Sequence, residues 1–182
     1  MTNLLKLSAI ALLIGVAFTS CGDCSKCTNE QPIAESSELE AANKQLEDNL
    51  KMYTTVWDDI INNGDLSLIN ETNFDENITL VASPENVVGI DAFKDYYNNF
   101  IVGFSNVSFT IVDVFGQGDK IVKHWSFKGT HTGEFFGIPA TGNEIDIDGV
   151  TLVLMKDGKI AQEQDFMDNL EFMQQLGIIP KE

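Results

Sequence analysis

Residues 129–142 read GTHTGEFFGIPATG, and after them apolar and polar side chains alternate over residues 144–156. The tetrapeptide DGKI at residues 157–160 then leads into a second alternating run, which ends as EQDFMD at residues 163–168. Alternation with a period of two predicts β-strands, and Asp-Gly between two such runs predicts a tight hairpin. The C-terminal half of the chain therefore predicts antiparallel strands joined by short turns.

The same period predicts four strands, at residues 106–116, 120–132, 144–156 and 159–168. A Gly-Gln-Gly-Asp turn at residues 116–119 joins the first two strands. A short helix is predicted at residues 169–177.

The first half of the chain has the period of a helix instead. Apolar residues recur at steps of three and four from Ser37 onward, which predicts one long amphipathic helix that ends at Asn63-Gly64. Asp65 is expected to cap a short helix, residues 78–81 form a brief strand, and residues 91–101 form another helix. Helices followed by an antiparallel meander predict an α+β domain over residues 37–182, with a curved sheet wrapped around the helices.

The order of these features resembles the SnoaL-like polyketide and ester cyclases, which belong to the nuclear-transport-factor-2-like superfamily. The resemblance rests on GTHTGEFFGIPATG, the DGKI turn, the strand that ends near Asp165, and the closing segment LEFMQQLG at residues 170–177. It implies a cystatin-like cone, in which N-terminal helices and the sheet enclose a pocket, over residues 45–178. It also implies a homodimer through the outer sheet face, where Val150, Leu152 and Leu154 form an apolar strip; in a monomer we expect the C-terminal helix to cover that strip.

Strand parity indicates which side chains share the pocket, because residues two apart on a strand point to the same face. The residues expected to meet in it lie on three strands and in the loop after the second predicted strand. The substrate-binding candidates are Trp125, Phe127, His131, Phe135, Thr151 and Met167.

Asp165 is the candidate catalytic residue. A carboxylate among aromatic and aliphatic side chains loses solvation, which is expected to raise its pKa toward the range useful for proton transfer. In the cyclases that the chain resembles, an aspartate at this place removes a proton α to a carbonyl and later protonates the new alkoxide, without a metal or organic cofactor. The alternative is a purely structural Asp165 that bonds to backbone or to Trp125, since this fold also serves many proteins that are not enzymes.

Two observations modify this expectation. Cyclases of this type commonly carry histidine or glutamine on the strand beside the aspartate, whereas this chain has Gly149 and Thr151 there. Threonine can bond to a carbonyl but does not shuttle protons near neutral pH. His131 lies at a strand end before a loop, so a structural role is favoured over catalysis.

The overall charge excludes some partners. The formal net charge is −17, and all 11 basic residues are lysines. Nucleic acids and anionic membrane surfaces require clustered basic residues, so neither is an expected partner. The absence of arginine also removes the bidentate fork that commonly binds phosphate.

The N-terminus has the pattern of an export signal. Lys6 precedes an apolar run over residues 7–18, and small residues then lead to Cys21. Residues 1–20 resemble a bacterial lipoprotein signal peptide, with Cys21 as the lipidated residue and residues 21–36 as a flexible tether. Cys24 and Cys27 are expected to form a local disulfide or remain thiols, and no metal site is predicted.

Two functional hypotheses follow. In the first, a lipid-anchored protein of the bacterial cell envelope, periplasmic or surface-exposed, binds a small, largely apolar carbonyl compound and acts on it through Asp165, as a cyclase or isomerase. In the second, the same pocket belongs to a non-catalytic ligand-binding or scaffold lipoprotein. Export favours the second hypothesis, because polyketide cyclisation normally occurs beside cytoplasmic synthases.

Overall fold

The computed structural model describes residues 31–180, with side chains from Ser36 onward. Cys21, Cys24, Cys27 and the predicted signal peptide lie outside this range. The helices are α1 (Gln31–Asn63), η1 (Leu66–Leu68), α2 (Ile90–Gly103) and α3 (Asn169–Gln175). The strands are β1 (Phe74–Leu80), β2 (Val87–Val88), β3 (Phe104–Gln117), β4 (Lys120–His131), β5 (Glu144–Lys156) and β6 (Lys159–Met167). No helix within residues 31–180 is long and apolar enough to cross a bilayer.

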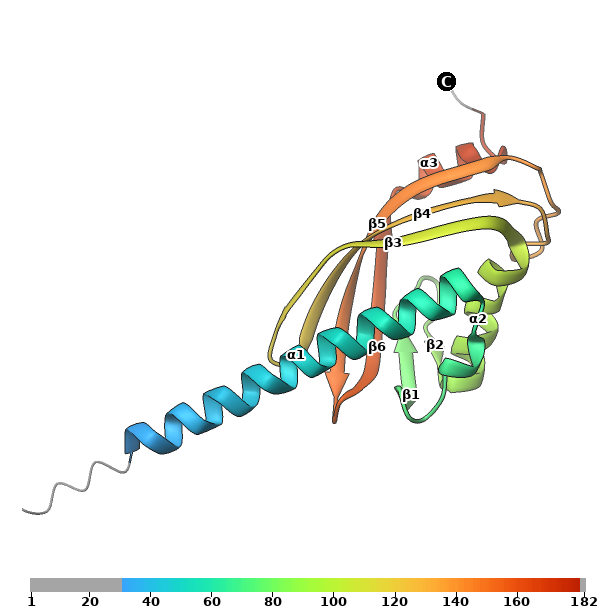
Figure 1. Cartoon of the computed structure of the whole chain (residues 1–182). Coiled ribbons are helices and arrows are strands. Elements are labelled where there is room, and N and C mark those ends of the chain that lie inside the picture. The colour runs from blue at the N-terminus through green and yellow to red at the C-terminus, as the bar shows by residue number, and fades with distance from the viewer. Residues whose placement is uncertain (1–30, 181–182) are drawn as a thin grey trace, which may run out of the picture.

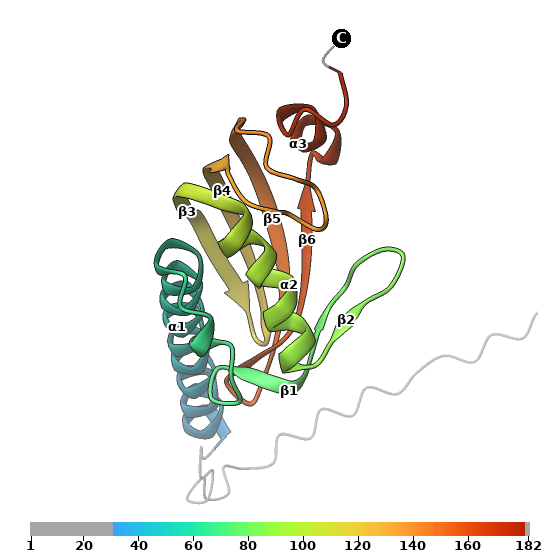
Figure 2. The same cartoon turned by 90° about the vertical axis from the view of Figure 1, so that its right-hand side faces the viewer.

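The predicted α+β class is confirmed. One curved sheet has the strand order β2-β1-β6-β5-β4-β3, and α1 and α2 lie against the same face of it (Figures 1 and 2). The last four strands form the predicted antiparallel meander. At the β5–β6 turn, Asp157 and Gly158 both have positive φ, at 51° and 76°, which suits the right-handed twist of a two-residue hairpin.

The sheet is mixed, which the sequence did not predict. β1 runs parallel to β6, with Leu80 opposite Glu163, and β2 adds a short antiparallel edge. This pairing makes β6 an interior strand with a neighbour on each side. Side chains on its concave face are therefore enclosed by the helices above and by adjacent strands on both sides.

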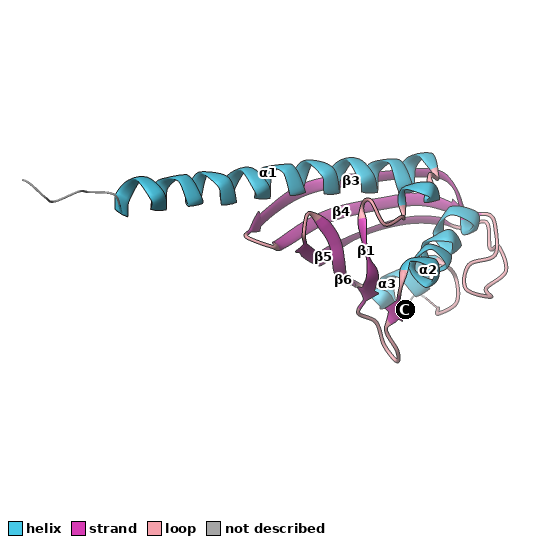
Figure 3. Ribbon diagram, turned by 90° about the horizontal axis from the view of Figure 1, so that it is seen from below, coloured by secondary structure: helices cyan, strands magenta, loops and turns pink. Residues whose placement is uncertain are grey.

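The long helix starts earlier than predicted, at Gln31 and not at Ser37. Pro32 falls in the first turn, where a backbone N–H has no partner within the helix, so proline does not interrupt it. The first turns of α1 extend beyond the sheet, and most side chains from Ser36 to Leu46 are exposed (Figure 3). Its later turns pack against β3.

The hydrophobic core fills the space between the helices and the concave sheet face. Trp57 of α1 lies at its centre, with ring centroids 4.6 Å from Tyr97 and 6.2 Å from both Phe74 and Phe93. Each such aromatic pair stabilises the fold by roughly 0.5–1.5 kcal/mol beyond simple burial. This cluster fixes α1 and α2 relative to the sheet.

The outer face of the sheet carries the predicted apolar strip. Leu152 and Leu154 are 44% and 40% exposed, and Phe115 and Phe166 lie on the same face. α3 does not cover the strip: its Phe172 and the residue after the helix, Leu176, are buried in the core instead, so that expectation for a monomer is wrong. The homodimer remains a prediction.

Candidate functional site

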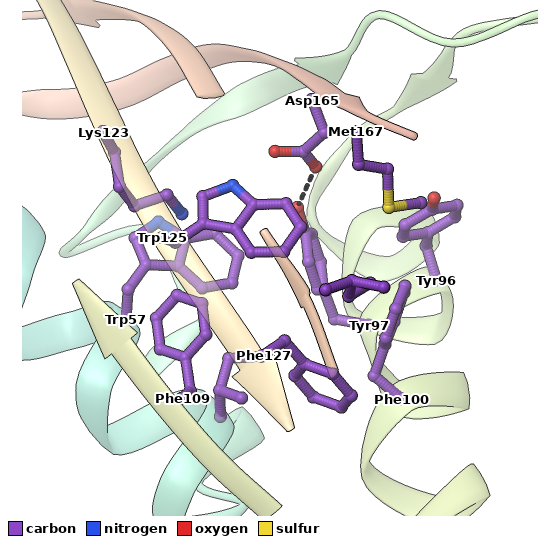
Figure 4. A pocket seen from close by; sticks show the side chains of 12 residues that line it. Trp57, Tyr96, Tyr97, Phe100, Phe109, Lys123, Trp125, Phe127, Asp165 and Met167 are labelled. Atoms are coloured by element: carbon purple, nitrogen blue, oxygen red, sulfur yellow. Dashed lines mark hydrogen bonds between the residues drawn. The ribbon is translucent and has the colours of Figure 1, made fainter. Parts of the chain in front are cut away.

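A small cavity opens between α1, α2 and the concave sheet face. Its volume is about 70 Å³, and most of its wall is aromatic (Figure 4). Lys123 and Asp165 are the charged residues in this wall. The lining residues are Trp57, Ile61, Tyr96, Tyr97, Phe100, Phe109, Lys123, Trp125, Phe127, Ile147, Asp165 and Met167.

Asp165 is held in place by hydroxyl groups. On the neighbouring strand, Thr151 Oγ1 donates to Asp165 Oδ1 and accepts from Trp125 Nε1 at 3.0 Å. From α2, Tyr97 Oη lies 3.2 Å from Asp165 Oδ2 (Figure 4). These bonds fix the orientation of the carboxylate. Asp165 is half-buried, and so it remains accessible from the cavity.

Glu163 lies two residues before Asp165 on the same face and is fully buried. Its Oε1 accepts from Tyr53 Oη at 2.7 Å and from Trp57 Nε1 at 2.9 Å. Tyr97 Oη lies 3.3 Å from its Oε2, so the single proton of this hydroxyl is shared between two carboxylates. Burial raises the pKa of Glu163 to about 7, although the charge of Lys123 opposes the shift.

Lys123 is the cation of this region. It is only 3% exposed, and its Nζ lies 4.5 Å from the ring centroid of Trp57 and 5.2 Å from that of Tyr53. Burial lowers the pKa of Lys123, whereas the charges of Glu163 and Asp165 raise it. Stacking over aromatic faces stabilises the ammonium form.

The structure explains why glycine stands beside Asp165. Gly149 pairs with Trp125 across the β4–β5 ladder, and the indole lies directly over it. A Cβ atom at Gly149 would lie 2.2 Å from Cζ2 of Trp125. Trp125 therefore occupies the space that a larger side chain at this position would fill.

Of the predicted site residues, Asp165, Trp125, Phe127 and Met167 line the cavity. Their functional roles remain predictions. Thr151 does not line it: this side chain is fully buried, and its hydroxyl bonds to Trp125 and Asp165. Its geometry is that of a residue that positions Asp165.

His131 and Phe135 lie at a different corner of the sheet and do not line the cavity. His131 is fully buried, its Nδ1 is 3.0 Å from Thr141 Oγ1, and its Nε2 has no hydrogen-bond partner within the described chain. Burial lowers the pKa of His131. Phe135 packs against Phe104, at 5.1 Å between centroids. His131 bonds to Thr141 of the loop over residues 132–143, and Phe135 belongs to this loop. A structural role for His131 remains a prediction.

Sequence reasoning missed Lys123, Glu163 and the tyrosines of α2. The parity of β4 places Lys123 between Ile121 and Trp125 on the apolar face, and a lysine inside such a row is a signal that could have been used. Glu163 shares its face with Asp165 in the same way. Tyr96 and Tyr97 could not be placed from strand parity, because they reach the cavity from a helix.

Comparison with known proteins agrees with this geometry. A family model for SnoaL-like polyketide cyclases matches residues 48–176. Among solved structures, TsrD from Streptomyces laurentii is 25% identical, with a TM-score of 0.65 over 72% of this chain and 96% of that one. A candidate polyketide cyclase from Bacillus cereus is 32% identical, with a TM-score of 0.52 over 64% and 72% of the two chains. A search of curated proteins gave no match.

Proposed function

Because the chain belongs to the SnoaL-like polyketide cyclase family, we propose that it binds a small, largely apolar carbonyl compound in the aromatic cavity and that Asp165 moves a proton of this compound. The observation that carries the proposal is the placement of Asp165. It is an oriented, half-buried carboxylate in a wall that is otherwise mostly aromatic. Such an environment binds the apolar body of a ligand while presenting one base to it.

The proposed reaction uses side chains of this chain alone. Asp165 takes a proton from the carbon next to the ligand carbonyl, so the C–H bond breaks, an O–H bond forms on Asp165, and the electron pair moves to the carbonyl oxygen. In an aldol closure, the enolate carbon then attacks a second carbonyl of the same molecule. Protonated Asp165 returns its proton to the new alkoxide. Thr151 and Tyr97 hold the carboxylate through both transfers.

The size of the cavity restricts the ligand. An apolar cavity of roughly 150 Å³ accommodates benzene, whereas this one measures about 70 Å³. Even a single ring therefore requires side chains to move. Tyr96 lines the cavity, and its ring lies 5.1 Å from that of Phe136, which is 45% exposed. We propose that these two rings move when the ligand enters.

Proton exchange tests this proposal directly. Acetophenone is incubated with the protein in D₂O, and the loss of its methyl proton signal is followed by NMR. We expect D165N to lower the catalysed exchange rate by about 10²- to 10⁴-fold, as is usual when a general base is removed. D148N is the matched control, because Asp148 is an exposed aspartate on β5, and it should exchange like the wild type. Equal rates for the wild type and D165N would refute a catalytic Asp165.

A non-catalytic binding protein is the second candidate. It is supported by Gly149 and Thr151: the first offers no side chain, and the second is already bonded to Trp125 and Asp165. In this case acetophenone would quench tryptophan fluorescence with saturation, while its exchange rate would remain that of buffer.

We further propose that Cys21 is lipidated and tethers the domain to a bacterial membrane. The support is the sequence pattern of residues 1–21, in which an apolar run ends in small residues before cysteine. Replacement of Cys21 by alanine should release the protein from the membrane fraction. Unchanged association with membranes would contradict the tether.

A further inference from the structure

The ammonium group of Lys123 is enclosed without a close anionic partner. Among the described residues, the ion pairs within 4.0 Å involve Lys44, Lys128 and Lys156, and not Lys123. The groups nearest to its Nζ are aromatic faces, of which Phe109 is a third at 5.5 Å from its ring centroid. Lysine is almost never buried unless it is paired, so this arrangement calls for a functional explanation.

Glu163 does not fill this role. Its Oε1 accepts two hydrogen bonds from α1, and its Oε2 lies beside Tyr97 of α2. The carboxylate is thus turned toward the helices and is held by their donors. It balances the charge of Lys123 at a distance, and it leaves the three N–H donors of the ammonium without a carboxylate acceptor.

The same ammonium faces the cavity. Lys123 and Asp165 both belong to the cavity wall, and Figure 4 shows the Lys123 amine beside the tryptophan rings. Charge interactions across such a poorly solvated space are stronger than in water. A ligand oxygen that carries negative charge would therefore gain more from Lys123 than from an exposed lysine.

We infer that Lys123 is a specificity-determining residue that binds an anionic ligand oxygen, so that the substrate class is a ketone that reacts through its enolate. This inference rests on the proposed function. When Asp165 takes the α-proton it becomes neutral, and the negative charge moves to the ligand oxygen. Lys123 then supplies the positive charge that stabilises this oxygen, with no bond formed to nitrogen.

A matched pair of stable probes tests this inference without requiring turnover. Benzoate has the ring and the negatively charged oxygen of the acetophenone enolate, whereas benzamide has the same shape without the charge. Both tryptophans of the chain, Trp57 and Trp125, line the cavity, so quenching of intrinsic fluorescence reports on binding there. We expect the wild type to bind benzoate at least about tenfold more tightly than benzamide, as for a hydrogen bond to a charged group.

Three variants show which residue causes the preference for benzoate over benzamide. K123M should lower the benzoate-to-benzamide preference to about one. K120M is the matched control, an exposed lysine on the same strand, and should keep the wild-type preference. D165N imitates the neutral aspartate of the enolate state and should bind benzoate more tightly than the wild type, because a repelling charge is removed.

The outcomes separate this inference from the proposed function. Equal affinities in the wild type, an unchanged preference in K123M, or no quenching by either probe would overturn the role of Lys123. If acetophenone exchange then still depends on Asp165, only the role of Lys123 is refuted and catalysis by Asp165 remains supported. A benzoate preference that depends on Lys123, together with no exchange, supports the anion site and refutes only the catalysis.

Discussion

Two corners of the concave sheet face each hold a titratable side chain, but only one of these side chains faces the cavity. At one corner, His131 has no exposed surface, an unpartnered Nε2 within the described chain, and no contact with the cavity. At the other, Asp165 receives a hydrogen bond from Thr151, lies beside Tyr97 Oη, and faces the cavity. The histidine is enclosed by a loop, whereas the aspartate is oriented toward a space that a ligand can enter.

The comparison shows that the most recognisable part of the sequence is not the part that carries the candidate chemical groups. Residues 129–142 are the most distinctive part of the sequence, yet they build the closed corner, where Gly133 and the following loop pack against the end of α2. The groups that could perform chemistry come from β4 and β6. A distinctive motif can therefore reflect a tight backbone approach that only a few residues allow.

The largest effect is expected from Gly133→Ala, which breaks the closed corner. A Cβ atom there would lie 2.0 Å from the carbonyl oxygen of Val102, a backbone atom that cannot move aside cheaply. We expect a loss of about 3 kcal/mol or more in the free energy of unfolding, or no folded protein. Urea denaturation measures this loss, and T132A is the control because Thr132 is exposed. A stability equal to that of the wild type would show that the loop is not packed as described.

An effect on the order of 3 kcal/mol is expected at Glu163, the buried carboxylate two residues before Asp165. Its pKa is about 7 in the folded protein against 4.5 unfolded. Between these values the folded state holds the proton that the unfolded state has lost. The contribution of Glu163 is therefore complete below pH 4.5 and is lost as the pH rises to 7.

The measurement is the free energy of unfolding of the wild type and of E163Q between pH 4.5 and 7.5. Glutamine keeps an oxygen acceptor for Tyr53 and Trp57 but does not titrate. The difference between the two proteins isolates Glu163 from other titrating groups. The wild type should lose stability relative to E163Q as the pH rises, and a constant difference would contradict the raised pKa.

The smallest effect is expected at His131, with the opposite sign. Because burial lowers its pKa, the unfolded state binds a proton first as the pH falls below 6.5, and stability is lost. In H131F an aromatic ring remains beside Phe104, and Thr141 can bond to water because it is exposed. The variant should lose less stability than the wild type from pH 7 to pH 5. Identical pH profiles would show that His131 is not enclosed.

Local patterns in the sequence were sufficient to predict the α+β class and the four-strand meander. Period-two alternation and the turn residues act locally, so the sequence places Asp165 near Gly149 or Thr151, and the structure pairs it with Thr151. The same parity put Trp125, Phe127 and Met167 on the inner face, and it correctly put Leu152 and Leu154 on the outer face.

The surroundings of Asp165 depend on tertiary packing. The parallel pairing of β1 with β6 encloses Glu163, and the packing of α1 and α2 brings Tyr53, Trp57 and Tyr97 to the two carboxylates. These contacts join segments that are far apart in the chain, so no local period encodes them. The grouping of Lys123 and Asp165 in the cavity wall, with Glu163 buried behind them, therefore results from packing.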